Sequence, residues 1–222
     1  MTDKTWQLHR NADSHRWQER RRLASNLRRL IEHSMFTEAS DDAVTEAADS
    51  VARLADNLGA KLGPTFFETV NTGNWEHDGG IYADRNFMLG VCNPLAPPMV
   101  VREDKDRVLG TVTLSYAYEG PPGAAHGGLV AALIDQIFGS LMVHTGVPSM
   151  TGKLTVRYHK PTPLKRELQL EGWVKEEQGK SVFCEAHLRC GGELIASADC
   201  LMVKVNNASL TKLFEQIRSE GT

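Results

Sequence analysis

The strongest constraint on the fold is a run at residues 125–144 that is almost continuously apolar and opens with His126-Gly127-Gly128. Its central stretch, 129–143, is interrupted by Asp135 and is shorter than the roughly 20 apolar residues that a membrane-spanning helix needs. A helix that is apolar on every side belongs in the interior of a globular domain. We therefore predict a buried core helix at 125–144, and no transmembrane segment.

Strand-like alternation of apolar and polar residues occurs on both sides of this run. It covers residues 108–118 before the run and residues 150–159, 166–175, 181–190 and 193–205 after it. Glycine-containing segments between the last three strands, Gln178-Gly179-Lys180 and Gly191-Gly192, are typical of hairpin turns. One long helix followed by an antiparallel meander predicts an α+β fold, with the apolar face of the sheet wrapped around the helix.

The first 60 or so residues show helical periodicity instead. Apolar residues recur every three or four positions in two segments, with Ser40 or Asp41 as the N-cap of the second and Gly59 as its stop. The first helix is rich in Arg and the second in Asp and Glu. Opposite charge predicts that these helices pack on each other or on a partner subunit. The arginines also fit a plain solvated face, or a docking surface for CoA, membrane or protein.

The pattern divides the chain into four parts. Residues 1–62 form an N-terminal helical extension, and residues 63–98 form a linker and ordered loop rich in Gly, Pro, Asn and Asp. Residues 99–205 form the α+β core, and residues 206–222 form a C-terminal helical tail.

Composition narrows the partners and the compartment. The chain has 222 residues, with 25 Lys and Arg against 28 Asp and Glu, so its net charge of -3 argues against a nucleic-acid binder. The four cysteines lack metal spacing, and Cys184 and Cys190 fit small core residues, with metal or redox chemistry as the alternative. The first 30 residues lack the apolar core of a secretory signal. We expect a cytoplasmic protein; the Arg-rich start leaves a transit peptide as the alternative.

The start of the apolar helix can stabilise developing negative charge. Its first N–H groups lack partners within the helix, and Gly127 and Gly128 allow a ligand to approach the backbone closely. A carbonyl oxygen that becomes negative would be stabilised there by the N–H groups and by the helix dipole. A glycine pair at this position also fits a packing or turn role, so the pair alone does not specify a site.

Asp135 makes the prediction of a functional site more specific. It lies about nine residues into the helix between apolar neighbours, where an unpaired carboxylate is costly. It therefore suits a base or a nucleophile, or else a buried Asp satisfied by a neighbouring hydroxyl or amide. Gly127 and Asp135 are about 12 Å apart along one helix, at 1.5 Å per residue. If both serve one carbonyl, two chains must contribute to one site, which predicts a homodimer or a dimer-of-dimers tetramer.

The order of motifs resembles the hotdog-fold acyl-CoA thioesterases, in particular the phenylacetate-pathway (PaaI-like) members and the mammalian thioesterase superfamily. The resemblance covers roughly residues 80–205. It rests on the His-Gly-Gly motif with Asp nine positions after the His, on Ser149-Met150-Thr151, and on the segments at 93–98, 119–123 and 158–164. It implies a hotdog fold and hydrolysis of a fatty or aryl acyl-CoA thioester to the free acid and CoA, with no metal or redox cofactor.

The resemblance also implies roles for individual residues. Gly127 matches the backbone donor to the thioester carbonyl. His126 matches the motif histidine that orders the loop. Asp135 matches the carboxylate that activates water or attacks directly. Thr151 matches a hydroxyl that binds this carboxylate or positions water. Some members carry an Asn six residues before the His, where this chain has Gly120, so carbonyl polarisation is left to Gly127 and its neighbours.

The phosphates of CoA need cations at the mouth of the site. Candidates for substrate binding are Gly128, Lys153, Arg157 and Lys160, each cation also fitting a plain solvated side chain. Alternation would place Lys153 and Arg157 on one face with Thr151. The competing function is a non-catalytic acyl-CoA-binding hotdog protein, which has no need of an ionisable group at Asp135. A hydratase of the same fold is a third possibility, but position 140 is Ser where the hydratases carry His.

Overall fold

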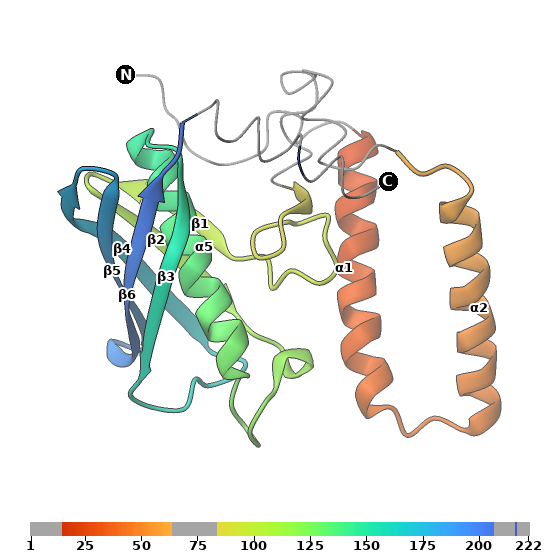
Figure 1. The fold of residues 1–222 in the computed structure, drawn as a ribbon. Helices are drawn as coiled ribbons and strands as arrows, with labels where there is room; N and C mark the ends of the chain where they lie inside the picture. The colour runs from red at the N-terminus through yellow and green to blue at the C-terminus, as the bar shows by residue number, and fades with distance from the viewer. Residues whose placement is uncertain (1–14, 64–83, 207–215, 217–222) are drawn as a thin grey trace.

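A six-stranded antiparallel sheet curls around one long helix, and two further helices project to one side (Figure 1). The computed structural model describes residues 15–63, 84–206 and 216. This sheet around a helix is the α+β arrangement that the sequence predicts. The expected tail at 206–222 and the first part of the linker lie mostly outside the described residues.

The helices and strands follow the predicted order. The helices are α1 (His15–Phe36), α2 (Asp41–Gly59) and α5 (Gly127–Thr145), with a 3-10 turn, η1, at Tyr116–Tyr118. The strands are β1 (Val100–Asp104), β2 (Arg107–Thr113), β3 (Ser149–Tyr158), β4 (Glu167–Gln178), β5 (Ser181–Cys190) and β6 (Glu193–Lys204).

The sheet has the order β1-β2-β4-β5-β6-β3, with every neighbouring pair antiparallel. Strand β3 follows α5 in the chain but lies at the far edge of the sheet, beside β6. The turns that join β4 to β5 and β5 to β6 contain Gly179, Gly191 and Gly192, all with positive φ. These positions favour glycine because they need left-handed backbone.

The core lies between the inner face of the sheet and α5. Eight residues of α5 are buried, among them Leu133, Ile137 and Phe138, which are fully inaccessible. By length and hydropathy alone, α5 could also cross a membrane. The sheet covers α5, however, as is typical of the core helix of a globular domain. Helix α5 begins after His126 and ends at Gly146, whose φ of 70° closes the last turn in the left-handed conformation.

Two local predictions are wrong. The strand expected at 108–118 ends at Thr113, because Ser115 accepts a hydrogen bond from the N–H of Ala117 and starts η1. Strand β1 is absent from the sequence prediction; it is a short edge strand in which Val100 is 60% exposed. The Asn93-to-Pro98 segment does form an ordered loop, in which the N–H of Ala96 donates to the carbonyl of Asn93.

The cysteines behave as the sequence predicts for core residues. Cys184, Cys190 and Cys200 are buried, Cys92 is half-buried, and none of the four forms a disulfide. Burial raises the pKa of Cys184 and of Cys200 to about 12 and that of Cys92 to about 11. These three thiols therefore stay protonated, and poorly nucleophilic, at neutral pH.

Candidate active site

The N-terminus of α5 leaves one backbone donor free. The Nδ1 atom of His126 accepts a hydrogen bond from the N–H of Gly128 at 3.0 Å, and its carbonyl accepts from the N–H groups of Leu129 and Val130. In the described part of the chain, the N–H of Gly127 has no such partner. Gly127 therefore holds the available N–H at the positive end of the helix dipole.

This geometry specifies the state of His126. Nδ1 can accept this hydrogen bond only in the tautomer that carries its proton on Nε2, so the cap requires that tautomer. The predicted loop-ordering role of His126 matches this contact, since the ring organises the first turn of α5. Gly128, a predicted substrate contact, has its N–H occupied by the same ring.

Tyr158 holds the same helix end from the other side. Its hydroxyl donates to the carbonyl of Gly127 at 2.8 Å, and its ring lies against the Gly127 Cα, where a Cβ would meet it at 3.5 Å. Two backbone hydrogen bonds of 2.9 Å fix the preceding loop. The N–H of His126 donates to the carbonyl of Tyr118, and the N–H of Ala125 donates to the carbonyl of Thr162. The N–H of Gly127 is thus held on an ordered support.

Gly120 occupies the position where some related proteins carry Asn. A Cβ at this position would lie 2.7 Å from the Cα of His126, closer than real Cβ contacts. The close packing of Gly120 against His126 explains why a residue without a side chain stands here. No amide from position 120 can help to polarise a carbonyl in this chain.

Asp135 lies on the side of α5 that faces β3. The hydroxyl of Thr151 donates to its Oδ1 at 2.8 Å, which confirms the prediction that a neighbouring group hydrogen-bonds this carboxylate. The carboxylate is half-buried, so solvent reaches it. A carboxylate with one oriented oxygen and access to water can act as a base or as a nucleophile.

A β-bulge in β3 aims Thr151 at this carboxylate. The pairing of β3 with β6 shifts between Thr151 and Lys153, so that Gly152 is the extra residue. Thr151 lies opposite buried Met202, and its hydroxyl turns inward to α5. A Cβ at Gly152 would lie 2.9 Å from a methyl of Val203, which explains why glycine occupies the bulge.

The bulge overturns one prediction about faces. Strict alternation would place Thr151, Lys153 and Arg157 together, whereas Leu154 and Val156 pack inward on the core and leave Lys153 and Arg157 on the other face from Thr151. The extra residue reverses the alternation at this point.

The predicted cations differ in their availability. Lys160 forms an ion pair with Glu193. Lys153 and Arg157 are exposed, and neither makes an ion pair within the described residues. They are therefore the more available of the predicted phosphate contacts.

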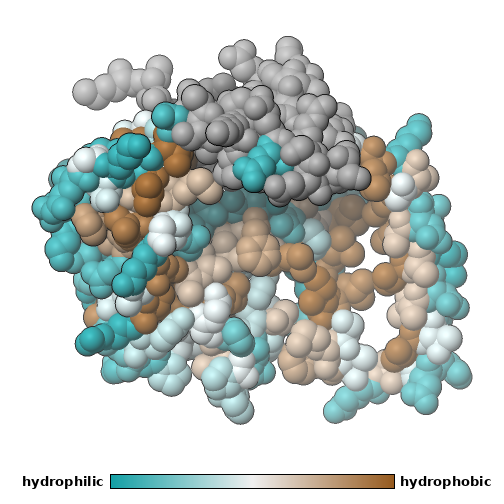
Figure 2. All heavy atoms as spheres, viewed as in Figure 1, coloured by the Kyte–Doolittle hydropathy of each residue, from teal (hydrophilic) through white to brown (hydrophobic). Residues whose placement is uncertain are grey.

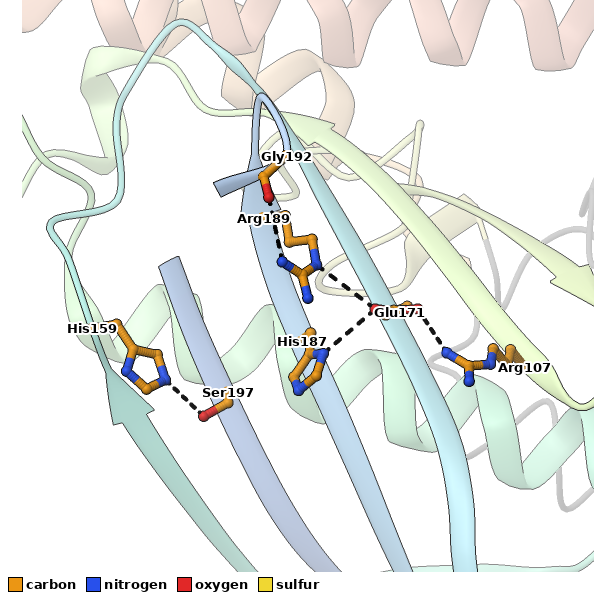
Figure 3. A network of polar contacts seen from close by, with 7 residues as sticks. All are labelled: Arg107, His159, Glu171, His187, Arg189, Gly192 and Ser197. Atoms are coloured by element: carbon orange, nitrogen blue, oxygen red, sulfur yellow. Dashed lines mark hydrogen bonds and ion pairs between the residues drawn. The ribbon is translucent and has the colours of Figure 1, made fainter. Parts of the chain in front are cut away.

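The other described histidines serve structural contacts. His187 and two arginines converge on Glu171 on the outer side of the sheet, with 2.9 Å from Arg107 to the carboxylate, 3.5 Å from His187 and 3.9 Å from Arg189 (Figure 3). His159 contacts the hydroxyl of Ser197 at 2.9 Å.

Sequence reasoning left out two contributors to the site. Gly152 carried a signal, because an isolated glycine within a strand pattern often marks a bulge. Tyr158 carried none, since its contact with Gly127 depends on how β3 crosses the start of α5.

The comparisons with known proteins match the part of the chain that holds these residues. The family model of the thioesterase superfamily matches residues 122–196, which include both ends of α5 and all of β3. Acyl-coenzyme A thioesterase THEM4 of Xenopus laevis is 35% identical over 89 residues, and that of Mus musculus is 30% identical over 90 residues. These matches cover 40% and 39% of the two relatives, so the chain spans about two fifths of the length of the curated relatives it matches.

One solved structure is similar over much more of the chain. The crystal structure of a thioesterase superfamily protein has a TM-score of 0.73 and 29% identity, and the match covers 83% of this chain and 90% of the other. Residues 84–222 make up less than two thirds of this chain. A match that covers 83% of the chain must therefore extend into residues before 84. The likeness therefore includes part of the N-terminal extension as well as the sheet and its helix.

Proposed function

We propose that the protein hydrolyses acyl-CoA thioesters, because residues 122–196 match the family model of the thioesterase superfamily and the fold is similar to that of a thioesterase superfamily protein. The observation that carries the proposal is the combination, on one helix, of a hydrogen-bonded carboxylate at Asp135 and a free N–H at Gly127. The named activity of the THEM4 relatives supports the substrate class.

The proposed reaction uses these two groups in sequence. Asp135 takes a proton from water as the water attacks the thioester carbon, or its own oxygen attacks to form an anhydride that water then opens. The N–H of Gly127 stabilises the oxygen that becomes negative in the tetrahedral intermediate. The C–S bond then breaks, the CoA thiolate leaves, and the free acid remains.

Thr151 and Tyr158 support the two reacting groups. Thr151 donates to Oδ1 of Asp135, which leaves the other carboxylate oxygen for water or for the thioester carbon. Tyr158 binds the carbonyl of Gly127 and thereby holds the peptide plane at the start of α5. Neither group needs to change its protonation state during the reaction.

We infer that two chains complete each site. Gly127 and Asp135 are eight residues apart on α5, or about 12 Å along its axis, too far to serve one carbonyl from the same chain. Strand β3 offers a contact for a second copy, because it is a ten-residue edge strand whose Met150 and Tyr158 are 48% and 49% exposed. Twofold pairing along β3 would bring Asp135 of one chain towards Gly127 of the other.

The phosphates of CoA would lie near this seam. Lys153 and Arg157 lie on the outer face of β3, exposed and without an ion pair in the described residues. Fatty and aryl acyl groups are both compatible with this proposal.

The test is hydrolysis of an acyl-CoA panel, from short to long chains with phenylacetyl and benzoyl, by the wild type and by Asp135→Ala. We expect free CoA from the wild type and about a 10³-fold loss in the variant, because both the base and nucleophile routes need the carboxylate. Asp199→Ala is the control, since it removes an exposed carboxylate from β6 instead. Tight acyl-CoA binding without turnover, or turnover that ignores Asp135, would overturn the proposal and favour a binding protein.

A further inference from the structure

The two N-terminal helices attach to the hotdog domain in different ways. Helix α1 is anchored: Arg21 pairs at 3.1 Å with Asp84, which is 2% exposed, and Arg28 donates to the carbonyl of Asn93 at 2.9 Å. At its other end, Glu32 of α1 pairs with Lys165. Helix α2 has no buried residue at all. We refer to α1 and α2 together, residues 15–59, as the helical arm.

The apolar side chains of α2 form one row. Val44, Val51, Leu54 and Leu58 recur at helical spacing and are between 40% and 49% exposed, and Leu62 just beyond the helix is 85% exposed. Figure 2 shows hydrophobic residues along the side of α2 that faces α1, with the space between the two helices only partly filled. The opposite side of α2 is polar. An amphipathic row of this kind is typical of a helix that packs against another surface.

In the part of the chain that the structure describes, no segment buries this row. Within the described residues, no hydrogen bond or ion pair joins α1 to α2. The sequence predicts that the two helices pack on each other or on a partner subunit, and the exposure of the row favours the second option. In proteins most of the stability of a helix comes from packing of its amphipathic face, so an occupant of the row would stabilise α2.

We propose that the occupant is the arm of a second copy of this chain. The charges of the arm are self-complementary, because α2 carries five acidic residues and one Arg, while α1 exposes Arg22 and Arg29 beside the arginines that bind its own chain. When two arms meet around a twofold axis, the acidic α2 of each can lie against the basic α1 of the other. The four helices then enclose the apolar rows of both chains.

The same charges disfavour a membrane surface as the occupant. Helices that lie on membranes carry Lys and Arg on their polar faces, which attract anionic lipids. The polar face of α2 instead carries Asp42, Glu46, Asp49 and Asp56, with Arg53 as its cation. Contact between two copies satisfies both the apolar row and the charges of the arm.

Cross-linking between chains tests this proposal without reference to catalysis. The full chain with Cys92→Ser and Leu54→Cys is prepared with two tags of different size, mixed, and treated with a short bismaleimide. We expect a product that carries both tags. Adding Val51→Glu and Leu58→Glu should reduce it by at least about tenfold, because carboxylates would enter the apolar contact.

The matched control places the same charges outside the row. Ser50→Glu and Asn57→Glu precede the two tested positions by one residue each, on the polar side of α2, and should leave the product unchanged. Circular dichroism checks that each variant keeps its helix content. No mixed product, or a product equally strong in the Val51→Glu and Leu58→Glu variant, would overturn the proposal. So would co-sedimentation of the arm with phosphatidylserine vesicles in place of cross-linking.

Discussion

Two helices of equal length have opposite surroundings in this protein. Helices α2 and α5 both contain 19 residues, yet eight residues of α5 are buried and none of α2 is. Helix α5 is apolar around its whole circumference and is wrapped by the sheet, whereas α2 has one apolar row and projects from the domain (Figure 1). Length and periodicity specify a helix, but the width of the apolar surface specifies how much of it is covered.

The difference also separates two roles. Because α5 is fixed on its buried sides, its half-buried residues Gly127 and Asp135 are held in defined positions, which suits the chemistry that we propose for them. The apolar row of α2 has no support within the chain and suits association. Catalysis and assembly would thus lie on different helices, and substitutions in one should leave the other intact.

Core truncation should separate the two helices most strongly. We expect Phe138→Ala in α5 to lower the free energy of unfolding by about 3–5 kcal/mol, because the side chain is fully buried and leaves a cavity. Leu54→Ala in α2 should change it by only about 0.5 kcal/mol at concentrations where arms are dissociated. Denaturant unfolding monitored by tryptophan fluorescence measures both. Equal losses would mean that α2 packs on the domain.

The free backbone donor gives the next largest expected effect. Gly127→Pro removes the N–H at the first helical position, where proline is well tolerated. His126 has φ -61° and ψ 130°, which also suits a residue before proline. We expect kcat for acyl-CoA to fall about 10²–10³-fold, as for the loss of one oxyanion donor.

Gly127→Ala is the matched control for this substitution. It keeps the N–H, and its Cβ would meet the Tyr158 ring at an ordinary 3.5 Å. It should therefore retain kcat within a few-fold. If the Ala and Pro variants lose the same activity with intact folding, the space at Gly127 matters and its N–H does not.

Thr151→Val should have a smaller effect on kcat. The substitution removes the hydrogen bond to Asp135 and keeps the shape of the side chain. A hydrogen bond to a charged group contributes about 1.5–3 kcal/mol, so we expect a loss of roughly 10- to 100-fold. Thr155→Val on the same strand is the control, because Thr155 is exposed on the outer face. Equal rates for the two variants would leave the bulge without a catalytic role.

Much of the fold could be predicted because its signals are local. The apolar run at 125–144 becomes α5 at Gly127–Thr145, and the alternation at 181–190 becomes β5 over the same residues. Ser40 is the N-cap of α2, where its hydroxyl accepts from the N–H of Ala43. Each of these signals depends on residues within a few positions of one another.

The failures come from contacts between distant segments. The alternation at 108–118 is interrupted where Ser115 caps η1, and there the N–H of Tyr116 donates to Glu32 of α1 instead of to a neighbouring strand. The face of Thr151 depends on the bulge, which is defined by pairing with β6. The contact of Tyr158 with Gly127 likewise joins residues 31 positions apart. Periodicity within one segment carries no information about such partners.

Subunit mixing tests the central claim that Asp135 and Gly127 of different chains complete one acyl-CoA thioesterase site. Asp135→Ala and Gly127→Pro chains are each expected to be nearly inactive. Co-expressed in equal amounts, they should recover about a quarter of the wild-type rate of CoA release, because half of the dimers contain one intact site. No recovery, in mixed dimers verified by mass spectrometry, would contradict the claim and place both groups in a single chain or outside the chemistry.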